Sequence, residues 1–347
     1  MRNLLFSLLL TSLPYLLAAQ LDELFKDPNV SYLATFETEH NFRLSAKRTS
    51  TKIQLLKFQQ SGQCPDFVTD NWLAHWILEG MGTGKFKAYD DPELSIWVAH
   101  TTLLSRISSI DTVITFDPKN YEERVQVIRN DINPDDIAGF RTHQAIYFDK
   151  KSGTYQTRLL ALAPLVTLTD ATGKIVSTSP IAWLAMDGKL PNGFSAQIPD
   201  VPWSVLLQER DKPLEISKLK VKKDEWKKSF AEQFFQNVKT TKLPVESARE
   251  GYGCGKLLSK KDIEAEYTSI DTIITFDPSN YEETMQVIKN DFQPADLKRV
   301  LLTQEWYFDD RRKLLCNRLK AISPLLDRYD ETGKTVIYTY PLYYLRS

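Results

Sequence analysis

The side chains best suited to chemistry in this sequence are histidines and cysteines, and neither group has the spacing of a known site. The four histidines lack the spacing of metal ligands such as those of an HExxH motif; they are His40, His75, His100 and His143. The three cysteines include no CxxC pair that would indicate zinc or thioredoxin-like chemistry; they are Cys64, Cys254 and Cys316. An odd number cannot all pair within one chain, and a Cys254–Cys316 disulfide stays open. We therefore predict no metal site.

A glycine-rich stretch at residues 80–85 resembles a phosphate-binding loop in composition only. Such a loop needs a Gly five positions before its Gly-Lys pair, followed by Ser or Thr, so that backbone donors surround the phosphate. Here Glu79 holds the first position and Phe86 the last. We predict a helix C-cap instead, and no bound nucleotide or other cofactor.

Carboxylates are numerous, and two of them could act as the general acid and base of a hydrolase. No GxSxG elbow or other nucleophile setting accompanies them. Most of the acidic residues discussed below have a structural explanation as caps, turns or ion-pair partners. We predict no catalytic residue, and a carboxylate-dependent hydrolase stays open as the alternative.

The elements that would position any site occur twice. The stretch from Ser109 to about Thr178 reappears from Ser269 without a gap, and about half of the aligned residues are identical. An earlier segment, Leu73–Leu78, resembles Phe230–Phe235. A period near 160 residues is domain-sized. We therefore predict two homologous domains in tandem.

Each copy predicts a mixed α+β module. The residues from Ile110 to Phe116 alternate as in a half-buried strand. Asp117-Pro118 and the apolar spacing from Tyr121 to Ile132 predict a helix after it. Turns at Ser152-Gly153 and at Asp170–Gly173 then predict antiparallel strands. The expected fold class is two tandem modules, each with helices packed on an antiparallel β-meander.

The meander predicts one polar face in each copy. With a turn at Ser152-Gly153, one face carries apolar residues, which are Ile146, Phe148, Leu159 and Ala161. The opposite face carries the polar repeat residues Tyr147, Asp149 and Arg158, matched in the second copy by Tyr307, Asp309 and Arg318. We interpret this face as a structural ion-pair network, with a binding site as the alternative.

The chain divides by composition into four parts. Residues 1–19 have the charge, apolar run and small residues of a secretory signal peptide cleaved after Ala19. The modules are expected at 20–187 and 229–347, with a Pro-broken, Lys-rich linker at 188–228. Lys220, Lys222 and Lys223 in that linker could contact an acidic partner, although a solvated strand explains them better.

The overall charge excludes one class of partner. The 347 residues include 44 Lys and Arg against 45 Asp and Glu. A nucleic-acid-binding protein needs a basic surface, so we exclude that class. The only long apolar run is the N-terminal one, which is too short to cross a bilayer comfortably, so a membrane-spanning protein is not expected.

Taken in order, the repeated motifs resemble a known family. They are Ile-Thr-Phe-Asp-Pro-x-Asn-Tyr-Glu-Glu, Val-Ile-x-Asn-Asp, Tyr-Phe-Asp, Arg-Leu-x-Ala-x-x-Pro-Leu and Asp-x-Thr-Gly-Lys, and Pro341–Arg346 ends the chain. This series is similar to the GldN/PorN family, a component of gliding motility and type IX secretion in Bacteroidetes. The resemblance covers most of both halves. It departs from the usual member in being duplicated.

The resemblance implies a non-enzymatic periplasmic part of the secretion machinery. Members of the family assemble with an outer-membrane lipoprotein, GldK/PorK, into large rings, so self-association is expected. We name Tyr340, Tyr343 and Tyr344 as aromatic anchors for a partner, with edge-strand core packing as the alternative. A secreted binding module that uses Trp72, Trp76 and Trp97 is a further alternative, although their helical spacing favours core packing.

Overall fold

The fold was taken from a computed structural model of the chain. It describes residues 16–40, 45–46, 67–68, 72–116, 119, 122–169, 175–186, 204–208, 213–223, 229–240, 244–249, 252–253, 255–266, 268–276, 279, 283–309, 314–329 and 336–347. Within this part the chain is mostly antiparallel β-sheet with a few helices. The turns expected at Asp170–Gly173 and Asp330–Gly333 lie outside the described residues, as do Cys64 and Cys254.

The first sheet is built around a long hairpin. Its central strands are β8 (Ile137–Asp149) and β9 (Thr154–Thr169), and the turn between them places Gly153 at φ +69°. This confirms the hairpin predicted at Ser152-Gly153. The remaining strands are β1 (Val30–His40), β4 (Ala88–Tyr89), β5 (Trp97–Val98), β10 (Ile175–Pro180), β11 (Trp183–Ala185) and β14 (Lys220–Val221), and the order is β14-β1-β8-β9-β11-β4-β5 with β10 beside β9.

The second sheet repeats this arrangement. Its strands are β12 (Ser204–Gln208), β13 (Leu214–Glu215), β15 (Val245–Ser247), β18 (Arg299–Asp309), β19 (Leu314–Tyr329), β20 (Val336–Pro341) and β21 (Tyr343–Arg346), in the order β12-β18-β19-β21-β15. Both β13 and β12 pair with β18, and β20 pairs with β19. Strands β8, β9, β10 and β11 thus have counterparts in β18, β19, β20 and β21. A short pair, β2 (Ser45–Ala46) and β3 (Phe67–Val68), completes the sheets outside the arms described below.

A shared bulge changes one face assignment. The register shifts between His143 and Gln144 in the first hairpin and between Thr303 and Gln304 in the second. Because the extra residue reverses the alternation, Ala161 pairs with His143, whereas Leu159 pairs with Gln144. The expectation that Leu159 and Ala161 share one face is therefore wrong.

The helices flank the sheets. They are α2 (Leu16–Lys26), α4 (Trp72–Gly82), α5 (His100–Ile107), α6 (Ser229–Thr240) and α7 (Lys260–Glu266), with short 3-10 turns η1 (Pro134–Asp136), η2 (Ile216–Lys218) and η4 (Pro294–Asp296). Helix α4 ends as predicted, because Lys85 N donates to Gly80 O at 2.8 Å and Gly84 N to Met81 O at 3.3 Å. Gly84 has a φ of +70°, as this C-cap requires.

The helix predicted between Asp117 and Ile132 is wrong. Strands β6 (Ser108–Phe116) and β7 (Glu123–Asp131) form an antiparallel hairpin there, and β16 (Thr268–Phe276) and β17 (Glu283–Asp291) form its counterpart. The β7 sequence contains Val125, Val127 and Ile128, whose β-branched side chains favour strands. Tyr121, Val125, Ile128 and Ile132 gave the helical spacing, whereas Val125 and Val127 alternate as in a strand.

The two sheets pack face to face through a buried polar contact. Gln304 Nε2 donates to Gln144 Oε1 at 2.7 Å, and these residues occupy the same position in the two repeats. Gln304 Nε2 also contacts Thr157 Oγ1 at 3.1 Å, and Asn317 Nδ2 contacts Gln144 Oε1 at 2.7 Å. Thr157 and Asn317 are also equivalent positions. The contacts are therefore reciprocal, as across an approximate twofold axis.

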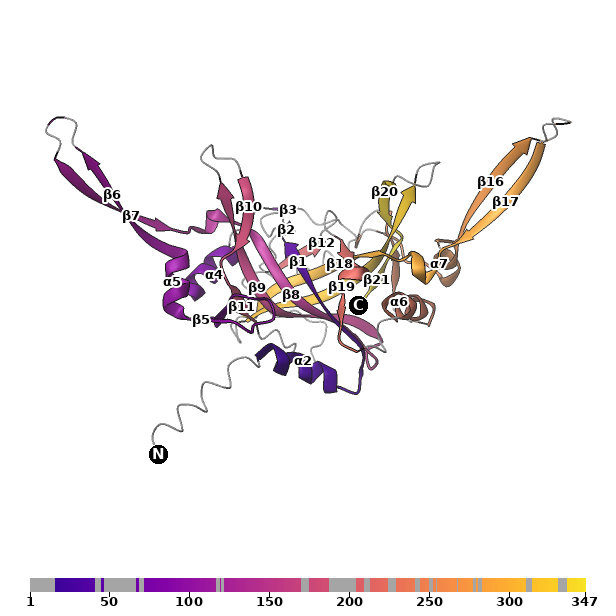
Figure 1. Cartoon of the computed structure of the whole chain (residues 1–347). Helices are drawn as coiled ribbons and strands as arrows, with labels where there is room; N and C mark the ends of the chain where they lie inside the picture. Colours follow the sequence, from indigo (N-terminus) through magenta and orange to yellow (C-terminus); the bar gives the residue numbers. More distant parts are fainter. Residues whose placement is uncertain are drawn as a thin grey trace.

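Aromatic packing follows the same reciprocity. On one side Tyr155 of β9 packs on Phe230 of α6, with ring centroids 5.3 Å apart. On the other side Phe308 of β18 packs on Trp76 of α4, with centroids 5.0 Å apart. Each hairpin therefore contacts a helix that belongs to the other half of the sequence, which joins both halves into one body (Figure 1).

The segment 188–228 contributes to both sheets. Strands β12 and β13 pair with β18, whereas β14 pairs with β1 through Ala34 and Val221. The division of this segment between a linker and a module stays a prediction.

Removal of the central amide should be costly. Gln144 is fully buried, and its Oε1 accepts from both Gln304 and Asn317. We expect Gln144→Ala to lower the free energy of unfolding by about 3 kcal/mol, because two buried donors lose their acceptor. Urea unfolding measures this. Gln126→Ala, at an exposed position, should change it by less than about 0.5 kcal/mol; equal effects would contradict the prediction.

Acid should destabilise the protein through one histidine. His143 is 2% exposed, and burial lowers its pKa from 6.5 to about 4, aided by Lys220 and Lys222 and opposed by Glu93. An unfolded histidine binds its proton below about pH 6.5 and the folded one only near pH 4, so stability is lost as pH falls through this window, by about 3 kcal/mol. His143→Thr introduces the residue that occupies the equivalent position 303 in the second repeat, and it should flatten the pH dependence of the free energy of unfolding. The exposed His75→Thr should not.

Candidate functional site

Two hairpin arms extend from opposite sides of the body (Figure 1). The first arm consists of β6 and β7, and the second consists of β16 and β17. A two-stranded ribbon without a packed face is marginally stable in water. The arms are therefore candidates for contact with another molecule.

One face of the first arm is apolar and exposed. The register pairs Ile114 with Val125, and the alternation places Ile110, Phe116 and Val127 on the same face. These five side chains are between 55% and 69% exposed. The opposite face is more polar and carries Thr115 and Gln126. Exposed apolar side chains grouped on one face usually mark an interaction surface.

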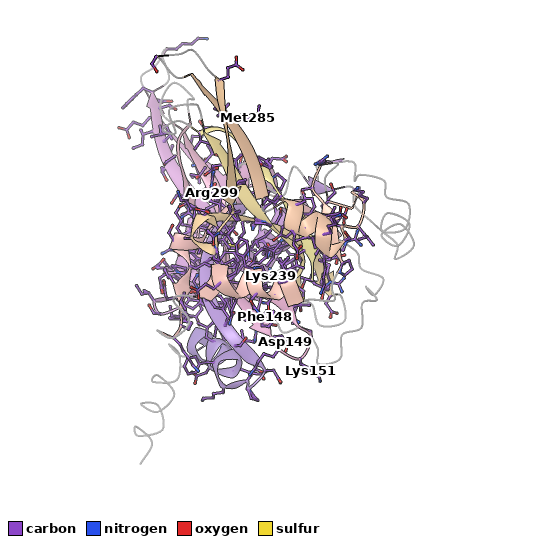
Figure 2. The ribbon with its side chains drawn as sticks, turned by 90° about the vertical axis from the view of Figure 1, so that its right-hand side faces the viewer. Phe148, Asp149, Lys151, Lys239, Met285 and Arg299 are labelled. Carbon is purple, nitrogen blue, oxygen red and sulfur yellow. The ribbon has the colours of Figure 1, made fainter. Side chains whose placement is uncertain are left out.

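The second arm has the same strand lengths and register. Met285 pairs with Ile274, as Val125 pairs with Ile114. Met285 is 67% exposed, and Figure 2 shows it on the part of the arm that projects beyond the body, far from Lys239 on α6. Met285 is therefore exposed at the position equivalent to Val125 of the first arm.

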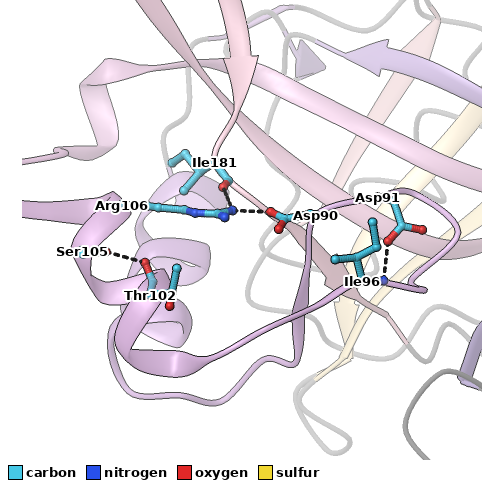
Figure 3. A network of polar contacts seen from close by, with 7 residues as sticks. All are labelled: Asp90, Asp91, Ile96, Thr102, Ser105, Arg106 and Ile181. Atoms are coloured by element: carbon cyan, nitrogen blue, oxygen red, sulfur yellow. Dashed lines mark hydrogen bonds and ion pairs between the residues drawn. The ribbon is translucent and has the colours of Figure 1, made fainter.

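The base of the first arm is fixed by helix α5, which leads directly into β6. Arg106 of α5 contacts Asp90 Oδ1 at 2.7 Å and the Ile181 carbonyl at 3.0 Å (Figure 3). The neighbouring loop is held by Asp91, whose carboxylate accepts from the Ser95 and Ile96 backbone. These hydrogen bonds lower the pKa of Asp91 although burial opposes them. The arm therefore starts from a rigid anchor.

An aromatic pocket of about 400 Å³ lies where α4 meets the second sheet. Trp72 and Trp76 stack with their ring centroids 6.1 Å apart, and both contact Phe308 of β18. Lys85 Nζ lies 5.0 Å from the Trp76 ring centroid. The rest of the lining consists of His75, Glu79, Gly80 and Thr83.

This pocket suits binding better than catalysis. Its only carboxylate is Glu79, which is exposed, so it offers no carboxylate pair for general acid–base chemistry. Its stacked rings and the Lys85–Trp76 cation–π contact give it an aromatic wall with a positive charge at one side. Trp97, the third tryptophan named from the sequence, is 53% exposed and lies outside the pocket lining.

The polar repeat residues of the first copy share one face of the hairpin, where the charges of Arg158 and Asp149 act on Tyr147, and they also have partners outside this group. In the first copy Tyr147 Oη donates to Gln156 at 2.9 Å, and burial raises the Tyr147 pKa to about 12. Arg158 pairs with Glu23 of α2 at 3.5 Å. Asp149 accepts from Lys151 N and Ser152 Oγ in the turn, and Figure 2 shows it beside Lys151 and Phe148.

The second copy differs in its ion pairs. Arg318 donates to Glu305 at 2.6 Å, and Lys320 lies 3.8 Å from the same carboxylate. Burial lowers the Lys320 pKa and raises that of Tyr307. Asp309 ends β18 at the position of Asp149. A binding role for this face stays a prediction.

The predicted partner-binding residues are mostly occupied within the chain. Tyr343 and Tyr344 are fully buried; Tyr343 stacks on Phe234 and Tyr344 packs on Tyr252, while Tyr340 is partly buried. Lys220 pairs with Glu93 at 3.1 Å, Lys222 N donates to Leu33 O, and Lys223 lies over the Phe25 ring. Whether any of these residues contacts a partner stays a prediction.

Among the described residues, no group of three or more His, Cys, Asp or Glu side chains could hold a metal ion. In the same part of the chain, no helix is long and apolar enough to cross a membrane. Cys316 is buried opposite Tyr307.

Sequence reasoning missed the arm and gave the tryptophan surface only as an alternative to core packing. It interpreted β7 as a helix, although Val125 and Val127 at alternate positions were a signal for a strand. The pocket needs Phe308 from the other half of the chain, so no local pattern could reveal it. The spacing of Trp72 and Trp76 did indicate that their rings lie together on one helix face.

Comparison with known proteins gives one family. The family model described as "Gliding motility associated protein GldN" matches residues 47–191 and again residues 209–346. No curated protein matches the sequence.

The anchor at Arg106 can be tested by substitution. We expect Arg106→Ala to lower the free energy of unfolding by about 1–2 kcal/mol, because a charged hydrogen-bond donor to Asp90 and Ile181 is lost. Amide hydrogen exchange at the base of β6 should also become faster. Arg129→Ala removes an exposed ion pair with Asp131 and should cost less than about 0.5 kcal/mol. Unchanged exchange in Arg106→Ala would remove this residue as the anchor.

Proposed function

Because the chain belongs to the GldN family, a component of gliding motility and type IX secretion, we propose that it is a non-enzymatic structural part of that machinery. The observation that carries this proposal is the family match in both halves of the chain. The family is a structural secretion-system component and is not known as an enzyme family.

The proposed location is the periplasm, reached through a signal peptide at residues 1–19. Helix α2 begins at Leu16 and so includes the proposed cleavage point after Ala19. Leu24, which is buried in the core, and Glu23, which pairs with Arg158, lie after that point. Cleavage at that point leaves these contacts intact.

The proposed assembly is a ring formed with a GldK/PorK-like outer-membrane lipoprotein. In this proposal the chain holds two GldN-like modules, at 20–187 and 229–347, on either side of the segment 188–228. The equivalent strand orders and the reciprocal Gln144–Gln304 contact support two modules of one kind. One chain would then supply two module positions.

A secreted binding module is the second candidate, and the pocket around Trp72 and Trp76 favours it. A binding module would hold a small ligand with no need for an envelope partner. Titration of soluble glycans and peptides, followed by the fluorescence of these tryptophans, distinguishes the two functions.

The direct test is capture from the native envelope. A tagged chain, cross-linked in cells and purified, should enrich an outer-membrane lipoprotein of the secretion machinery. Deletion of the gene that encodes this chain should abolish secretion and gliding. Enrichment of no envelope component, together with normal secretion in the deletion strain, would overturn the proposal.

The tyrosines can be tested in the same assay. Tyr340→Ser changes a partly buried side chain and should leave the fold intact, whereas Tyr343→Ser should destabilise it by about 3 kcal/mol because a fully buried ring is removed. Weaker capture of the lipoprotein by a folded Tyr340→Ser chain would assign this residue to the interface. Unchanged capture would remove it.

A further inference from the structure

We propose that the apolar face of the first arm packs on the equivalent face of the second arm, the face that carries Met285, of another copy of this chain. Neighbouring copies would then join head to tail through arm-to-arm contacts. This inference rests on the proposed assembly into a ring, and it names the surface that connects one copy to the next.

The need for a partner comes from the exposure of the first arm. Ile110, Ile114 and Val125 lie on one face and are 69%, 55% and 63% exposed. Burial of such side chains against a partner is favourable, because it removes apolar surface from water. Nothing in the described part of the chain covers this face, and the arm is too thin to cover it by itself.

The second arm of another copy is the proposed partner, because the two arms of one chain point away from each other (Figure 1). They leave the body at its two opposite ends (Figure 1), so the arms of one chain cannot meet. The strands of the two arms have equal lengths of nine residues and the same register. Two flat faces of matching length pack well as stacked sheets.

The charges on the arms fit this arrangement. On the first arm Arg129 lies near the base, opposite Ile110, and Glu123 lies near the tip, opposite Phe116. On the second arm Glu283 takes the tip position, opposite Phe276, and Lys289 takes the base position, opposite Ile270. Arms that approach from neighbouring copies overlap in opposite directions, so the base of one meets the tip of the other.

The overlap would therefore place Arg129 of one copy near Glu283 of the next. Both side chains are exposed, and Arg129 uses only its Nε for the ion pair with Asp131, so the other guanidinium nitrogens can reach Glu283. Two arms that overlap in the same direction would instead bring Glu123 beside Glu283, which is repulsive. Charge thus selects the opposed, head-to-tail arrangement.

The contact is small, which determines how it must be measured. A nine-residue hairpin face is about 30 Å long and about 10 Å wide, so one contact buries about 600 Å² in total. Stable interfaces bury about 1,200 Å² or more. A single contact is therefore weak, and ring closure or a second partner would strengthen it by multivalency.

The first test uses neighbouring residues on opposite faces of one strand. Val125→Asp introduces a charge in the apolar face, whereas Gln126→Asp introduces the same charge on the other face. Sedimentation velocity of the purified chain over rising concentration should show at least tenfold weaker self-association for Val125→Asp and an unchanged value for Gln126→Asp. Circular dichroism and thermal unfolding verify that both variants fold, as expected at exposed positions. Unchanged association in Val125→Asp would overturn the proposal.

Mixing establishes that unlike arms meet. Val125→Asp alone and Met285→Asp alone should each stay monomeric, because each lacks one of the two faces. Their mixture should give dimers, since the intact second arm of one variant can pack on the intact first arm of the other. Dimers of Met285→Asp alone would show that like arms pair and would overturn the head-to-tail arrangement.

A charge exchange tests the direction of overlap. Arg129→Glu should weaken association, and the double variant Arg129→Glu/Glu283→Arg should restore it. Failure of the double variant to restore association would contradict the opposed overlap. Capture of the envelope lipoprotein by Val125→Asp is measured separately from self-association. If Val125→Asp captures the lipoprotein and also self-associates as strongly as the wild type, the arm contact is overturned while the proposed function is left intact.

Discussion

The hydrogen bond between Gln144 and Gln304 is the constraint on which the rest of the arrangement depends. It joins equivalent positions of the two repeats inside a dry contact between sheets, where an unpaired amide would be expensive. Its geometry requires the two hairpins to cross at this point. That crossing places each hairpin over a helix of the other half, so that Phe308 reaches Trp76 and Tyr155 reaches Phe230.

The crossing also decides where the arms point. Each arm follows a helix on the outer side of its own sheet, and the approximate twofold relation sends the two arms to opposite ends of the body (Figure 1). The aromatic pocket arises from the same crossing, because Phe308 enters a site that α4 cannot complete alone. Core packing and exposed surfaces thus have one common geometric origin.

The sequence predicted the repeat, the hairpin at Gly153 and the C-cap at Gly84, because each depends on local backbone chemistry. It failed where local patterns are ambiguous. Tyr121, Val125, Ile128 and Ile132 fit a helical stripe, whereas Val125 and Val127 alternate as in a strand, and the pairing of Val125 with Ile114 resolves the two interpretations. The His143–Gln144 bulge and the site around Phe308 depend on contacts between distant residues, which no window of sequence contains.

The presence of both sheets in one polypeptide has a consequence for dilute conditions. A twofold contact between separate chains dissociates as concentration falls, and its stability cannot be separated from the amount of protein present. Here residues 144 and 304 belong to one polypeptide, so the rate at which their contact forms and its stability do not depend on the protein concentration. A single molecule can therefore fold completely at any concentration, and only the association between copies requires enough protein.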